Sequence, residues 1–124
     1  MLANAIVTAL IGTARAEQSK AFYRDTLGLT LASEDAFAMV FSGKNARVRI
    51  SRVPAVTPAP YAVLAFSVEN IETTADALIA KGVTMARFPI LQQDARGLWT
   101  APDGTKVCWL HDPDLNLLSL VQNP

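Results

Sequence analysis

Residues 107–122 read VCWLHDPDLNLLSLVQ, which is the clearest local pattern in the chain. Two apolar runs rich in Val, Leu and Trp flank a short polar segment. Pro113 presets the backbone angle φ there, and the carboxylates of Asp112 and Asp114 can accept hydrogen bonds from nearby backbone N–H groups. Apolar runs on both sides of such a turn predict a β-hairpin.

The composition favours a folded domain without a nucleic-acid partner. The chain has 124 residues, of which 51% are hydrophobic, and its formal net charge is zero. This length suits one domain, or two small halves that share a core. A balanced charge with scattered Lys and Arg argues against nucleic-acid binding. The single cysteine, Cys108, lies in an apolar run, which favours a buried inert thiol.

Membrane segments are not expected. No apolar run is long enough to span a bilayer. The apolar N-terminus resembles a signal peptide only weakly, because no basic residue precedes it and Asn4 and Thr8 interrupt it. We therefore expect a cytoplasmic protein with no membrane partner.

The pattern of strands and helices is repeated. In the first half we predict a strand at 4–11, a helix at 16–26 and strands at 29–33, 37–41 and 46–53. In the second half we predict a strand at 61–68, a helix at 70–80, a strand at 83–88 and the hairpin. Segment 54–60 holds three prolines and reads as an extended linker. The chain is thus predicted to hold two βαβββ modules, 1–53 and 61–124, in an α+β fold with the helices on one face.

Three motifs resemble those of the vicinal oxygen chelate superfamily, which includes glyoxalase I, bleomycin-resistance proteins and extradiol dioxygenases. They are AFYRDTLGL at 21–29, VENI at 68–71 followed by a helix and KGV at 81–83, and the closing hairpin. These are packing and turn residues, so they support the fold more than the function. The resemblance implies two paired modules that form a U-shaped curved sheet, with the helices on its outer face and the ligand in the concave groove.

The resemblance also implies a metal site, but this chain departs from it. Metal enzymes of the superfamily use four His, Gln or Glu ligands on the first and last strands of the modules. The corresponding positions fall on Thr8, on Val63, near Arg49 and on Ser119. Divalent transition metals need imidazole or carboxylate ligands. We therefore expect no metal and no cofactor, and His111 cannot form a metal site by itself.

Strand alternation predicts what would line the groove instead. If Val48 and Ile50 pack under the helix, Arg47 and Arg49 face the groove. The same reasoning adds Tyr61, Val63, Leu117 and Ser119, and the repeat adds Thr8 and Leu10. Trp99 is included because the loop at 92–100 could lie over the mouth of the groove. The predicted ligand-binding residues are thus Thr8, Leu10, Arg47, Arg49, Tyr61, Val63, Trp99, Leu117 and Ser119. Two alternatives stay open: the arginines could lie on an exposed edge and contact only water, and Trp99 could be a core or dimer-contact residue.

These observations favour a metal-free protein that binds a small aromatic or anionic molecule. A first alternative is a glyoxalase- or dioxygenase-type enzyme with an atypical or absent metal site, in which His111, Tyr23 or Tyr61 would transfer protons. A second is a subunit with a vestigial groove and a role in interaction. No catalytic residue can be assigned from the sequence.

We predict a two-fold symmetric homodimer. Curved sheets leave open edges, which proteins usually pair or cover, and relatives of this fold often complete their grooves across a two-fold axis. Light scattering should therefore give twice the chain mass at micromolar concentration. A monomer mass under those conditions would contradict the prediction.

Overall fold

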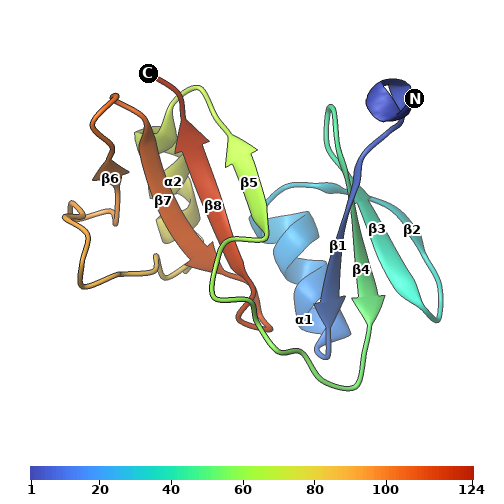
Figure 1. Cartoon of the computed structure of the whole chain (residues 1–124). Helices are drawn as coiled ribbons and strands as arrows, with labels where there is room; N and C mark the ends of the chain where they lie inside the picture. The colour runs from blue at the N-terminus through green and yellow to red at the C-terminus, as the bar shows by residue number, and fades with distance from the viewer. The chain divides into compact units, whose positions relative to one another are not determined.

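The structure, a computed structural model, describes residues 1–124 and divides into two compact units, Met1–Thr57 and Pro58–Pro124. Each unit holds one α-helix and one four-stranded mixed sheet (Figure 1). Both units follow the order strand, helix and three strands, which confirms the predicted α+β class and the βαβββ repeat.

The element bounds are as follows. The first unit contains β1 (Thr8–Thr13), α1 (Ala16–Ala21), β2 (Thr30–Glu34), β3 (Ala38–Ser42) and β4 (Arg47–Arg52). The second unit contains β5 (Leu64–Ser67), α2 (Ile71–Ala80), β6 (Trp99–Thr100), β7 (Lys106–His111) and β8 (Leu117–Gln122). A 3-10 turn, Leu2–Asn4, precedes β1, and a π-helical turn, Phe22–Thr26, extends α1. Neither α-helix has the length and apolar content that a membrane crossing requires.

The two sheets have the same topology. Their strand orders are β1-β4-β3-β2 and β5-β8-β7-β6. In each unit the first strand pairs in parallel with the last strand, and the remaining pairs are antiparallel. The last strand of each unit is therefore an inner strand with a bonded neighbour on both sides.

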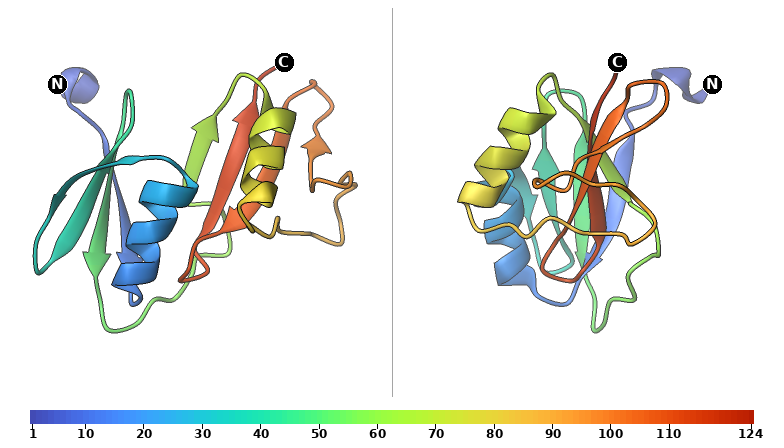
Figure 2. Two further views of the ribbon diagram at one scale, coloured as in Figure 1. Left: turned by 180° about the vertical axis from the view of Figure 1, so that it is seen from behind. Right: turned by 90° about the vertical axis from the view of Figure 1, so that its left-hand side faces the viewer.

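The first core lies between α1 with its π-helical extension and one face of the sheet (Figure 2). Tyr23 is fully buried, and its ring lies 5.7 Å from that of Phe41. Val48 and Ile50 of β4 are also buried, as the alternation predicts. Gly28 follows the helical segment with φ of +80°, a left-handed conformation that glycine adopts without strain.

The second core lies between α2 and its sheet. Asn70 caps α2, because its side chain accepts a hydrogen bond from the backbone N–H of Thr73 at 3.0 Å. Two contacts join the helix to the sheet: the backbone N–H of Ile71 donates to Gln122, and Lys106 forms an ion pair of 2.7 Å with Glu72. The core residues beneath α2 are Cys108, Leu110, Leu118 and Leu120, all of them buried.

The predicted strand at 83–88 is wrong. That segment makes only an isolated bridge, Met85 to Leu110, and the fourth strand of the sheet is β6 instead. The physical reason is local: the side chain of Gln93 accepts a hydrogen bond from the backbone N–H of Phe88 at 2.8 Å and so replaces a strand partner. The chain from α2 to β6 follows a long irregular path (Figure 1).

The first strand begins later than the sequence predicts. Apolar character favours extended backbone from residue 4, but β1 starts at Thr8. In the parallel register Thr8 pairs with Arg47, the first residue of β4. The partner strand sets the start of β1, whereas the apolar character of residues 5–7 does not.

The hairpin is confirmed. Strands β7 and β8 pair from Lys106 with Gln122 to His111 with Leu117. The carboxylate of Asp112, which is 4% exposed, accepts hydrogen bonds from the backbone N–H groups of Asp114 and Asn116 and from the side-chain amide of Asn116, each at 2.9 Å. One carboxylate thus satisfies three donors and holds the turn.

We predict that Asp112→Ala lowers the free energy of unfolding by about 3 kcal/mol, because buried donors lose a charged acceptor. Urea denaturation measures the change. Glu69→Ala is the matched control, since Glu69 is exposed and should leave the midpoint unchanged within about 0.5 kcal/mol. Equal midpoints for both variants would contradict this role of Asp112.

Candidate functional site

Each sheet has one face that packs under its helix and one that does not; we call the second one the open face. In the first unit, the hydroxyls of Thr13 on β1 and Ser19 on α1 lie 2.8 Å apart, which marks the helix side of β1. Because side chains alternate along a strand, Thr8 and Leu10 belong to the open face. The register places Arg47 beside Thr8 and Arg49 beside Leu10.

The open face of the first unit is basic and partly apolar. Leu10 is 73% exposed, Arg47 is exposed and Arg49 is half-buried. No carboxylate pairs with either arginine. Since β4 is an inner strand, the two arginines do not lie at the edge of the sheet.

A nearby carboxylate does not neutralise this charge. The pKa of Asp35 is lowered mainly by hydrogen bonds from the backbone N–H groups of Ala38 and Phe37, with Arg49 contributing less. These two bonds are 2.9 and 2.8 Å long, so the Asp35 carboxylate is held by its own turn. Arg49 is left able to form a charged hydrogen bond with another molecule.

The open face of the second unit is mainly apolar. Ser119 pairs with Ala65 on one side and with Trp109 on the other. Trp99 on β6 pairs with Val107 and lies on the same face. The hydroxyl of Ser119 is buried and donates to the carbonyl of Leu64 at 3.4 Å.

Two further predicted residues lie where β5 and β8 begin: Val63 directly precedes β5, and Leu117 is the first residue of β8. The backbone N–H of Val63 donates to the carbonyl of Leu117 at 2.9 Å. Leu117 also lines a cleft of about 510 Å³ within the second unit, together with Tyr61. Sequence reasoning missed Trp109, which lines the same cleft. The alternation of residues 107–111 places Trp109 opposite the core residues, so the pattern contained this signal.

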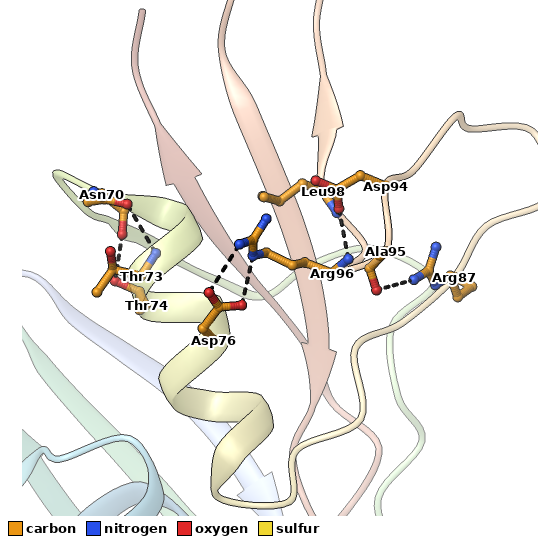
Figure 3. A network of polar contacts seen from close by, with 9 residues as sticks. All are labelled: Asn70, Thr73, Thr74, Asp76, Arg87, Asp94, Ala95, Arg96 and Leu98. Atoms are coloured by element: carbon orange, nitrogen blue, oxygen red, sulfur yellow. Dashed lines mark hydrogen bonds and ion pairs between the residues drawn. The ribbon is translucent and has the colours of Figure 1, made fainter.

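The irregular segment 86–98 forms another wall of this cleft, and we call it the strap. The side-chain amide of Gln93 donates to the carbonyls of Ala86 and Gly97 at 2.9 and 2.8 Å. Figure 3 shows how the strap is joined to α2: Arg96 forms a bidentate ion pair with Asp76, with distances of 2.7 and 3.1 Å. The guanidinium of Arg96 lowers the pKa of the Asp76 carboxyl.

The side chains suggested for proton transfer belong to both units: Tyr23 to the first, Tyr61 and His111 to the second. Tyr23 is fully buried in the first core, away from the open face, so its suggested role in proton transfer is not supported. Burial raises the pKa of the Cys108 thiol to about 11, which keeps it protonated at neutral pH. His111 and Tyr61 are exposed side chains of the second unit.

The positions that the resemblance gives to metal ligands do not fit a metal. The register makes Arg49 and Ser119 equivalent: Arg49 pairs with the residue two after Thr8, and Ser119 with the residue two after Val63. The side chain of Val63 has no atom that can bind a metal ion, and the positive charge of Arg49 repels a cation. No group of three or more His, Cys, Asp or Glu side chains could hold a metal ion.

The fold and its open faces define a class of two-module α+β proteins with a βαβββ repeat. A family model of the glyoxalase/bleomycin resistance protein/dioxygenase superfamily matches residues 5–120, and the chain belongs to this family. No match is found among curated proteins.

Solved structures show the same fold at low sequence identity. The antibiotic binding protein TnmS3 from a Streptomyces species is 18% identical, with a TM-score of 0.77, and the alignment covers 100% of this chain and 99% of that one. Lactoylglutathione lyase from Agrobacterium tumefaciens is 16% identical, with a TM-score of 0.74 and coverage of 96% and 93%. At these identities the likeness establishes the fold and not the ligand.

We predict no stoichiometric divalent metal in the purified protein. The four positions equivalent to metal ligands lack imidazole and carboxylate groups. Elemental analysis after incubation with Zn²⁺ and desalting checks this. About one Zn, Fe, Ni or Mn per chain, lost on treatment with EDTA, would contradict it and favour an enzyme of the glyoxalase or dioxygenase type.

Proposed function

We propose that the protein binds a small anionic or electron-rich aromatic molecule without a metal. The observation that carries this proposal is the pair of arginines on the open face of the first unit, where no carboxylate neutralises them. An arginine presents a planar fork of donors that matches a carboxylate, a phosphate or a phenolate. Leu10, exposed beside Arg49, would contact the apolar part of the ligand.

The remaining predicted residues are proposed as ligand contacts within their own unit. In the first unit, Thr8 would supply a hydroxyl group beside Arg47. In the second unit, Val63, Leu117, Tyr61 and Trp99 would supply apolar surface, and Ser119, whose hydroxyl is bonded to the carbonyl of Leu64, would add to it. Mostly apolar walls with a few fixed polar groups are typical of small-molecule sites. A related fold occurs in an antibiotic binding protein, which agrees with binding as the function. The concave groove, the homodimer and the cytoplasmic location stay predictions.

The support for binding over catalysis is chemical. A glyoxalase- or dioxygenase-type reaction needs a bound cation, and the corresponding positions hold Thr8, Val63, Arg49 and Ser119. A fixed positive charge at Arg49 favours a negatively charged ligand in the place of a cation. We therefore propose that the charge of Arg49 selects the ligand.

We predict that 2-naphthoate raises the melting temperature more than 2-naphthylmethylamine does. Arg49→Gln should weaken 2-naphthoate binding roughly tenfold to a hundredfold, because a charged hydrogen bond contributes roughly 1.5–3 kcal/mol. Thermal shift and isothermal titration calorimetry measure the two effects, and circular dichroism checks that the variant stays folded.

Arg15→Gln is the matched control. It removes the same charge from an exposed position before α1, where no ion pair forms, and should leave the affinity unchanged. Full affinity in Arg49→Gln, or equal losses in both variants, would refute the role of Arg49.

A further inference from the structure

The cleft of the second unit differs chemically from the arginine-bearing face. Its volume of about 510 Å³ lies within the range of small-molecule sites, roughly 300–1,000 Å³. Six of its lining residues are Tyr61, Phe88, Ile90, Leu91, Trp109 and Leu117, and the others are two prolines and an alanine. No charged side chain lines it, so an ionic ligand would lose hydration there without gaining a partner.

The aromatic wall of the cleft is held in place before any ligand binds. The rings of Phe88 and Trp109 meet nearly at right angles, at 84°, with their centroids 5.2 Å apart. Trp99 contacts Trp109 from another direction at 6.4 Å, and the two rings are tilted by 36°. Rings packed in this way lose little freedom on binding, which favours a flat ligand that stacks on them.

The strap that carries Phe88, Ile90 and Leu91 is fixed at its base. Gln93 makes three hydrogen bonds of 2.8 to 2.9 Å to the strap backbone. Its far end is joined to α2 through Arg96 and Asp76 (Figure 3). The side chain of Ile90 is nevertheless 93% exposed, so the strap presents apolar surface at the lip of the cleft.

We propose that this cleft is a second subsite, which takes an uncharged planar aromatic group. The proposal rests on the proposed function as a small-molecule-binding protein and adds the class of ligand. The neutral lining favours an uncharged group, and the aromatic walls favour a planar one. Trp109 and Tyr61 each carry one polar hydrogen, which can bind an acceptor on the ring system.

The test uses Nile red, an uncharged planar dye whose emission rises in apolar surroundings. Ile90→Glu places a charge at the lip and should weaken Nile red binding at least about tenfold, while the exposure of Ile90 protects the fold. Ile79→Glu is the control, because Ile79 is 42% exposed on α2 and does not line the cleft. Unchanged affinity in Ile90→Glu, or equal loss in both variants, overturns the proposal.

Substitution of the two tryptophans locates the dye independently. Trp109 lines the cleft and Trp99 does not, although their ring centroids are 6.4 Å apart. Trp109→Phe should therefore weaken Nile red binding more than Trp99→Phe does. Equal affinities for Nile red in the two variants would refute the subsite.

Two further outcomes distinguish this subsite from a dimer contact and from dye bound elsewhere on the chain. If Ile90→Glu changes the sedimentation coefficient and leaves Nile red binding intact, the cleft contacts a second copy of the chain and the proposal is overturned. If Arg49→Gln weakens Nile red binding as much as Ile90→Glu does, dye binding depends on the arginine, and the proposal of a separate neutral subsite is overturned. If Arg49→Gln weakens 2-naphthoate binding and leaves Nile red binding unchanged, both proposals are supported. If Arg49→Gln leaves 2-naphthoate binding unchanged while Ile90→Glu still weakens Nile red binding, only the proposal of an anionic ligand is refuted.

Discussion

The parallel pairing of the first strand with the last strand is the constraint on which each unit depends. It makes β4 and β8 inner strands, bonded on both sides, so that neither can slip in register. A slip of one residue would place Arg47 and Arg49 under α1 and expose Val48 and Ile50. Burying an unpaired charge costs several kcal/mol. Exposing each aliphatic side chain adds roughly 2 kcal/mol to that cost.

One helix per sheet gives the two faces of each sheet different surroundings. In each unit the helix packs on one face and the other face carries no helix of that unit (Figure 2). The alternation of residues then decides the chemistry of that face. In the first unit it gives Arg47 next to Thr8 and Arg49 next to Leu10, and in the second it gives Trp109 next to Ser119. The same topology thus carries a basic surface in one unit and an aromatic one in the other.

The irregular segment that we call the strap supplies side chains to the cleft that the strands do not. The strap contributes Phe88, Ile90 and Leu91 to the cleft, although it contains no strand. The side chain of Gln93 takes the place of strand partners and satisfies both an N–H group and two carbonyls. A half-buried amide that makes three such hydrogen bonds fixes a segment whose structure hydrophobic periodicity does not predict.

The sequence by itself determined the α+β class, the repeat, the hairpin and the side of the sheet on which Val48 and Ile50 lie. Each of these depends on local chemistry or on a two-residue period, which neighbouring residues reveal. Its resemblance to the superfamily also predicts that Ser119 stands where metal-binding relatives have a carboxylate. The tertiary structure decided the rest: the start of β1 depends on the register with β4, and β6, only two residues long, has no period to detect. The strap and its cleft depend on contacts of Gln93 and Trp109 with residues that no local pattern identifies as partners.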